Sequence, residues 1–378
     1  MSTSAAYPSS TPRERWIDVA KGIAIILVVF FHATFDYTAD AHVWQWGGYT
    51  ELLETFRMPL FFFTAGIFAA KVLSRPLRDL VDLRILKFAW LYFLWSIIAI
   101  VVFWTAIGEF QGVGGTLVEI ARTVIQPNGQ TWFIYAIVVY FLLGWALRRL
   151  PIVVRLGVAL ALTLVFQYGL FVDPYSEWGK VGKYFLFFLL AVEFGPWVRR
   201  LVPRLKWWHT LIAPAAYALL VFVFRRLDWI DAPIGSVKEL ASWTVLSVLA
   251  VAAGCSVAIL LARWAAFDWL FHLGSRTLQV YLLHWYLLLI GWWLVAVAPS
   301  IPGVVAPFLV PALTAFAIAG ALLVHRFTRR ATLLYGQPKW LHLPLKSAAS
   351  AAPATPSSPV EPELPASPSG TPASDLPR

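Results

Sequence analysis

The feature that most constrains this chain is a series of apolar segments, each about as long as a bilayer is thick, separated by short basic clusters. A helix that crosses a membrane needs about 20 mostly apolar residues. Ten segments meet that requirement: residues 17–38, 52–73, 85–106, 131–148, 151–171, 183–199, 208–225, 240–262, 277–298 and 304–325. Composition agrees, because 60% of the residues are hydrophobic and 13% charged, against about 45–50% and about 25% in soluble domains. We predict an all-α, polytopic membrane protein with about ten transmembrane helices.

The distribution of basic residues predicts the topology, because cytoplasmic loops carry an excess of Lys and Arg. With the N-terminus in the cytoplasm, 23 of the 30 Lys and Arg residues fall on the cytoplasmic side and 7 on the other. One helix more or fewer would reverse every later loop and remove this asymmetry. We therefore expect both termini in the cytoplasm. The net charge of +10 does not indicate nucleic acid, because the basic residues form no single patch.

The ends of the chain differ from its apolar body. The last part is rich in Ala, Pro and Ser and has almost no large apolar side chains, so it cannot bury enough surface to fold. We predict a disordered N-terminal tail at residues 1–12, a transmembrane domain at 13–345 and a disordered cytoplasmic tail at 346–378. The longest outer connection, about residues 107–130, contains three glycines close together and is predicted to be a flexible loop.

The first predicted span carries four ionisable residues on one face, namely Asp18, Lys21, His32 and Asp36. A helix turns about 100° per residue, so His32 lies within about 20° of Lys21, and the two aspartates lie about 60° away on the same side. Ionisable side chains in a span are costly and face a cavity or the bundle interior. His32 lies about 16 Å further out than Lys21. This spacing suits coenzyme A, with phosphates at the cytoplasmic face and a thioester on a long arm, and Asp36 could orient the His32 imidazole.

These residues also have structural interpretations. His32 could make an interhelical hydrogen bond, and Asp18 with Lys21 could form an i,i+3 ion pair. At the start of the third predicted span, Arg84 and Lys87 lie one turn apart. They could bind phosphates or form an ordinary positive flank.

Weaker candidates occur elsewhere in the chain. For His284, one turn after Tyr281, a functional and a structural role are equally plausible. Glu193 could help an acceptor hydroxyl or pair with a cation. We find no Gly-x-Ser-x-Gly elbow, no zinc-spaced His/Cys set and no nucleotide loop. We expect no metal and no tightly bound cofactor.

The chain resembles the integral-membrane acyltransferase-3 family, particularly its fucose 4-O-acetylase-like branch. The similarity begins at residues 17–32, where ten apolar positions separate Lys21 from His32. It continues with Met58-Pro59-Leu-Phe-Phe-Phe-Thr-Ala-Gly66, Arg84-Ile-Leu-Lys87, Thr131-Trp132-Phe133, Leu273-Gly274-Ser275 and Tyr281-Leu-Leu-His284. These landmarks follow the family's order across about residues 13–325.

The resemblance implies an O-acyltransferase that moves an acyl group, usually acetyl, from cytoplasmic acyl-CoA to a hydroxyl of a glycan, a lipid-linked sugar or a small molecule. It implies that His32 is the catalytic base and that Lys21, Arg84 and Lys87 serve the acyl donor, with acetyl-CoA as co-substrate. Most of the family has Arg at the positions of Lys21 and Lys87. Lys keeps the charge and loses the bidentate fork, and the first of these changes is usual in the fucose-acetylase-like branch.

We therefore expect a multi-pass O-acetyltransferase of the cell inner (plasma) membrane that acts in a single step, since no good Ser or Cys nucleophile appears. One alternative is a transporter or flippase for a lipid-linked sugar, which predicts two halves with internal symmetry. No convincing repeat relates residues 1–170 to residues 171–340. A structural membrane protein without activity is the other alternative, and it would be indicated if His32 were dispensable.

Overall fold

The computed structural model describes residues 14–34, 46–106, 112–298 and 304–343. The side chains of residues 47–52 and 103–106 are not described. Of the described residues, 79% are helical and none lies in a strand. The all-α class is thereby confirmed. The two predicted tails lie outside the described residues, and their disorder stays a prediction.

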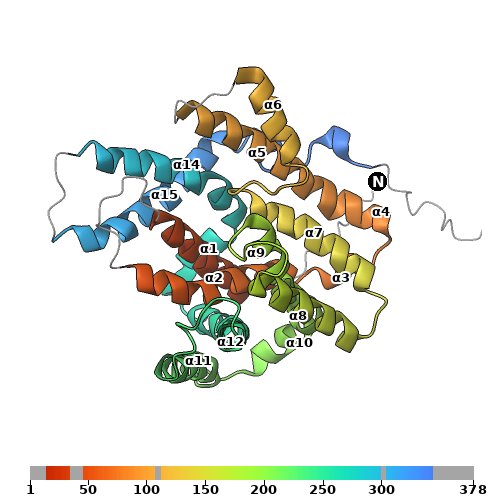
Figure 1. The fold of residues 1–378 in the computed structure, drawn as a ribbon, viewed down its shortest axis with the longest axis vertical. Coiled ribbons are helices and arrows are strands. Elements are labelled where there is room, and N and C mark those ends of the chain that lie inside the picture. The colour runs from red at the N-terminus through yellow and green to blue at the C-terminus, as the bar shows by residue number, and fades with distance from the viewer. Residues whose placement is uncertain (1–13, 35–45, 107–111, 299–303, 344–378) are drawn as a thin grey trace, which may run out of the picture. The chain divides into compact units, whose positions relative to one another are not determined.

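Each predicted apolar segment coincides with a helix (Figure 1). The long helices are α1 (Arg15–Ala33), α2 (Gly47–Gly66), α5 (Leu86–Ala106), α7 (Trp132–Leu147), α8 (Ile152–Tyr168), α10 (Phe185–Leu201), α11 (His209–Arg226), α12 (Val237–Leu261), α14 (Thr277–Ala296) and α15 (Ala306–Thr328). Shorter helices are α3 (Ala70–Leu73), α4 (Leu77–Leu80), α6 (Gly112–Arg122), α9 (Glu177–Lys183) and α13 (Asp268–Gly274). A π-helical segment, Val81–Ile85, leads into α5, and 3-10 turns occupy Val202–Arg204, Ala265–Phe267, Thr332–Leu334 and Lys339–Leu341.

Within the described residues, five helices are long and apolar enough to cross a membrane. They are Arg15–Ala33, Leu77–Val102, Val237–Leu261, Thr277–Ala296 and Ala306–Thr328. The second of these is the continuous helical run made by α4, the π-helical segment and most of α5. The helices α7 and α8 are apolar but shorter, α10 has 17 residues, and α2 carries charged residues in its first half. The protein is thus a multi-pass membrane protein, while the number of ten spans and the side on which the termini lie stay predictions.

The connection at about residues 107–130 differs from its prediction. It contains a helix, α6, so the expectation of a flexible loop is wrong for the part of the connection that the structure describes. The glycines fall in the first turn of α6, where helix-breaking residues disturb few hydrogen bonds, and Gly112 itself has a positive φ of 75°. The end of α6 is held by the Tyr92 hydroxyl, which donates to the Thr123 carbonyl over 2.7 Å.

The helix α1 lies at the centre of the packing. It contacts α2, α12, α13, α14 and α15, and its apolar residues Val19, Ala20, Ala24, Ile25 and Val29 have no exposed surface. Close approach to α13 depends on two glycines, since small residues let membrane helices meet at backbone distance. A Cβ at Gly22 would lie 2.5 Å from the Leu270 carbonyl oxygen, and one at Gly274 would lie 1.6 Å from the backbone carbonyl oxygen of Asp18.

We expect Gly274→Ala to destabilise the protein, because the backbones of α1 and α13 must separate. The expected loss is at the level of an overpacked core, about 1–3 kcal/mol, or above it. The measurement is thermal unfolding in detergent, followed by intrinsic fluorescence. Gly157→Ala in α8 is the matched control, because a Cβ there meets nothing within 4 Å. Equal unfolding temperatures for the two variants would contradict the close contact.

Candidate active site

Two cavities lie along the polar face of α1. The larger one, about 1030 Å³, is lined by His32 and His284 and is called the histidine cavity below. The smaller one, about 270 Å³, is lined by Lys21, Arg84 and Lys87 and is called the basic pocket. The structure therefore brings together the three cations that the sequence singled out, although they come from different elements.

The basic pocket draws each cation from a separate part of the chain. Lys21 comes from α1, Arg84 from the π-helical segment and Lys87 from the first turn of α5. π-helical turns are rare and occur frequently at functional sites. Lys21 Nζ lies 3.5 Å from Asp18 Oδ1, so the i,i+3 ion pair exists while Lys21 also lines the pocket. Neither of the other two cations forms an ion pair with a carboxylate of the described residues.

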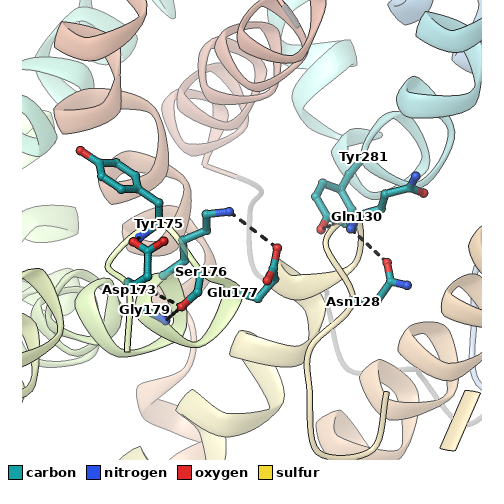
Figure 2. Close-up of polar contacts among 9 residues, drawn as sticks. Asn128, Gln130, Asp173, Tyr175, Ser176, Glu177, Gly179 and Tyr281 are labelled. Carbon is teal, nitrogen blue, oxygen red and sulfur yellow. Dashed lines mark hydrogen bonds and ion pairs between the residues drawn. The ribbon is translucent and has the colours of Figure 1, made fainter. Parts of the chain in front are cut away.

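A thin aromatic wall separates the two cavities. Phe61, Phe133 and Tyr281 line both of them, so the wall is one layer of side chains thick. The Phe61 and Phe133 rings have centroids 4.7 Å apart, and those of Phe133 and Tyr281 are 5.4 Å apart. The Tyr281 hydroxyl donates to the Gln130 carbonyl oxygen over 2.7 Å, as Figure 2 shows. Phe61, Phe133 and Tyr281 therefore lie between the basic pocket and the histidine cavity.

The two histidines form a directed hydrogen-bonded pair. His284 Nδ1 lies 2.6 Å from the carbonyl oxygen of Tyr281 and 3.2 Å from that of Val280. Carbonyl oxygens only accept, so Nδ1 carries the hydrogen and Nε2 of the neutral ring carries a lone pair. That Nε2 lies 3.2 Å from His32 Nδ1, which therefore donates to it. A ring N–H of His32 also donates to the Val28 carbonyl oxygen. A neutral His32 that donates from Nδ1 keeps its lone pair on Nε2, as a general base requires.

The structure leaves the other two candidates with different outcomes. Asp36 lies outside the described residues, and its role in orienting His32 stays a prediction. Glu193 forms an ion pair with Arg155, 2.7 Å between Oε1 and Nη1. It is not among the residues that line either cavity. Of the two interpretations of Glu193, pairing with a cation is the one the geometry supports.

Charged residues in the wall of the histidine cavity escaped the sequence analysis, which treated the basic ones only as topology markers. Arg57 is 8% exposed, and its guanidinium lies over the Phe31 ring, 3.3 Å from Cζ to the centroid. The neighbouring Glu54 forms an ion pair with Lys183, 2.5 Å between Oε1 and Nζ. The available signal was an acid and a base three residues apart inside a predicted span, which is rare unless the site is functional.

The short helix α9 adds a further charged pair to this wall. Lys180 Nζ lies 3.9 Å from Glu177 Oε1. In Figure 2, Glu177 lies between Asp173, Tyr175 and Ser176 on one side and the Tyr281–Gln130 contact on the other. Ser176 caps α9 by accepting from the Gly179 backbone N–H over 3.1 Å. Burial lowers the pKa of the Lys180 ammonium, and the Glu177 carboxylate acts in the opposite direction.

No group of three or more His, Cys, Asp or Glu residues in the described part of the chain could hold a metal ion. The side chains that line the two cavities offer acid–base and electrostatic chemistry. The fold and the two cavities define a helical membrane protein with two histidines in one cavity and three cations in the next. This layout suits the transfer of a group from an anionic donor.

Comparison with known proteins gives the family. The family model described as an acyltransferase domain, that of the acyltransferase-3 family, matches residues 14–326. The chain belongs to this family, and it is a membrane acyltransferase. Searches of curated proteins and of solved structures each found no significant match. The resemblance to the fucose 4-O-acetylase-like branch stays a prediction.

Proposed function

We propose that the protein is an O-acetyltransferase that uses acetyl-CoA as donor and a hydroxyl of a glycan, lipid-linked sugar or small molecule as acceptor. Lys21, Arg84 and Lys87 bind the phosphates of the donor in the basic pocket. His32 is the catalytic base, and His284 positions it. The observation that carries this proposal is the arrangement of the basic pocket directly behind the histidine cavity, with one aromatic layer between them.

The reaction follows from the protonation state of the histidine pair. His32 Nε2 accepts the proton of the acceptor hydroxyl while that oxygen attacks the thioester carbonyl carbon. The C–O bond forms, the C–S bond breaks, and the thiolate of coenzyme A leaves with the proton that His32 has taken up. A positive charge on His32 during the step is shared with His284 through the Nδ1–H bond. No covalent acyl-enzyme is needed.

The proposed membrane arrangement agrees with this direction of transfer. Ten spans with both termini in the cytoplasm place the Lys21 end of α1 at the cytoplasmic face and the His32 end towards the outer face. Acetyl-CoA then enters the basic pocket from the cytoplasm, and its acyl arm reaches the histidine cavity past Phe61, Phe133 and Tyr281. We propose the inner (plasma) membrane of the cell as the location.

The test is transfer of radiolabelled acetyl from acetyl-CoA to cell-envelope glycan or lipid-linked sugar, in membranes that contain the protein. Labelling is expected only in membranes with the active protein, and the acetyl group should be released by mild base, as oxygen esters are. Label that remains resistant to base would contradict O-acylation. A second label on the coenzyme moiety separates acetyl transfer from tight donor binding.

Neutralising the basic pocket is expected to weaken donor binding. We expect Arg84→Gln or Lys87→Gln to raise the KM for acetyl-CoA by about 10-fold each, since a hydrogen bond to a charged group contributes about 1.5–3 kcal/mol. The same variants should act like wild type on S-acetylpantetheine, which lacks the nucleotide phosphates. Lys71→Gln is the matched control, because Lys71 is exposed and lines neither cavity. An equal loss with both donors would place the effect outside phosphate binding.

A further inference from the structure

The charge balance of the histidine cavity singles out Arg57. The charged residues that line the cavity are Glu54, Arg57, Glu119, Arg122, Glu177 and Lys180. Arg122 pairs with Glu119 over 2.6 Å, and Lys180 with Glu177 over 3.9 Å. Glu54 forms an ion pair with Lys183, which is 1% exposed and is not among the residues that line the cavity. Among the described residues, Arg57 is therefore the lining charge without a carboxylate partner within ion-pair distance.

Arg57 is also unsatisfied as a hydrogen-bond donor. Its Nη1 is buried and has no hydrogen-bond partner among the described residues. The Phe31 ring under the guanidinium stabilises the charge from one face, and Nη1, in the plane of the group, lacks an acceptor among the described residues. Glu54 favours the Arg57 charge electrostatically, but its ion pair is with Lys183. A buried charge that lacks an ion pair of its own is unfavourable, and an anion that enters the cavity would supply one.

From this geometry we infer that the acceptor of the reaction carries an anionic group, a carboxylate or a phosphate, which binds between Arg57 and Lys180 in the histidine cavity. This inference rests on the proposed function, because it names a property of the acceptor of that reaction. Arg57 is suited to the task because its planar fork binds both oxygens of a carboxylate or phosphate at once. Lys180 contributes a second charge, since its pairing with Glu177 is loose.

The direct test is ligand binding by the purified protein in detergent, without any acyl donor. Glucose, glucuronate and glucose 6-phosphate are titrated separately, and binding is followed by thermal stabilisation and equilibrium dialysis. We expect at least one of the two anionic sugars to bind about 10-fold tighter than glucose. The comparison between glucuronate and glucose 6-phosphate distinguishes a carboxylate from a phosphate as the bound group. Equal affinity for all three sugars would overturn the inference.

Variants assign the discrimination to Arg57. In Arg57→Gln the preference for the anionic sugar is expected to disappear, and in Arg57→Lys part of it is expected to remain. Arg122→Gln is the matched control, because Arg122 lines the same cavity but is paired with Glu119, and it should keep the preference. Since Arg57→Gln removes a charge whose burial is costly, it should unfold at a temperature no lower than that of wild type in the absence of sugar. An anion preference that survives in Arg57→Gln would overturn the assignment.

Acetyl transfer separates this inference from the proposed function. Arg57→Gln is expected to raise the KM for the anionic acceptor about 10-fold more than the KM for a neutral acceptor. An equal loss of kcat with both acceptors would make Arg57 a group that stabilises the transition state, and the anion subsite would be wrong. Anion binding without any acetyl transfer would contradict the proposed function and leave the subsite intact. Transfer without anion discrimination would do the reverse.

Discussion

His32→Ala is expected to lower acetyl transfer by about 100- to 10,000-fold, the range that a positioned general base contributes. The loss should appear in kcat, because His32 accepts the proton only as the new bond forms. His32 lines the histidine cavity, whereas the donor phosphates are proposed to bind in the basic pocket. Donor binding should be retained, since the basic pocket does not include His32. The measurement is acetyl transfer in membranes with matched amounts of protein, together with coenzyme A binding.

The matched control for that variant is His272→Ala. His272 is exposed and lines neither cavity, so its loss should leave the rate unchanged. Equal labelling by wild type and His32→Ala would refute the proposed mechanism without affecting the fold. Loss of both acetyl transfer and coenzyme A binding in His32→Ala would indicate a structural defect.

His284→Leu is expected to lower the rate by about 10- to 100-fold, because a hydrogen bond to a group that becomes charged contributes about 1.5–3 kcal/mol. Without the His284 Nε2 acceptor, His32 Nδ1 loses a hydrogen bond, and the Val28 carbonyl oxygen remains as an acceptor for the ring. His32 is then held less firmly in the tautomer with its lone pair on Nε2, and it loses the partner that shares its charge. The donor and acceptor KM values should change little, since His284 is proposed to act through His32.

Two further variants distinguish a positioning role from simple packing. His284→Gln places an amide oxygen near the position of Nε2, and it should recover much of the rate that His284→Leu loses. In the His32→Ala background, His284→Leu should have almost no further effect, because residues that act as a unit are not additive. Additive losses, or no recovery with glutamine, would show that His284 contributes only to packing.

The sequence alone determined the class of protein and the helix face that carries Lys21 and His32. Length and composition of the apolar segments fix helices, because a bilayer leaves backbone polar groups no partner other than their own helix. The period of the helix likewise places Lys21 and His32 on one face of α1, since both lie on a single rigid element. The family resemblance rested on the same local runs, and the match over residues 14–326 confirms it.

Other features depended on contacts between distant segments, which no local pattern encodes. His284 reaches His32 across 252 positions of sequence, so its partner and its tautomer follow only from the packing of α14 against α1. The helix α6 was missed because its glycines suggest a loop, whereas contacts such as that between Tyr92 and Thr123 hold it in place.

Only the tertiary structure decided which charges are satisfied. From sequence, Glu54 and Arg57 are natural partners, since they lie three residues apart on one helix face. In the folded chain Glu54 forms its ion pair with Lys183 of α9, and Arg57 lines the histidine cavity. The sequence determined which charged groups enter the membrane domain, because that depends on local composition. The fold determined which of them remain available to a ligand, because pairing depends on distances across helices.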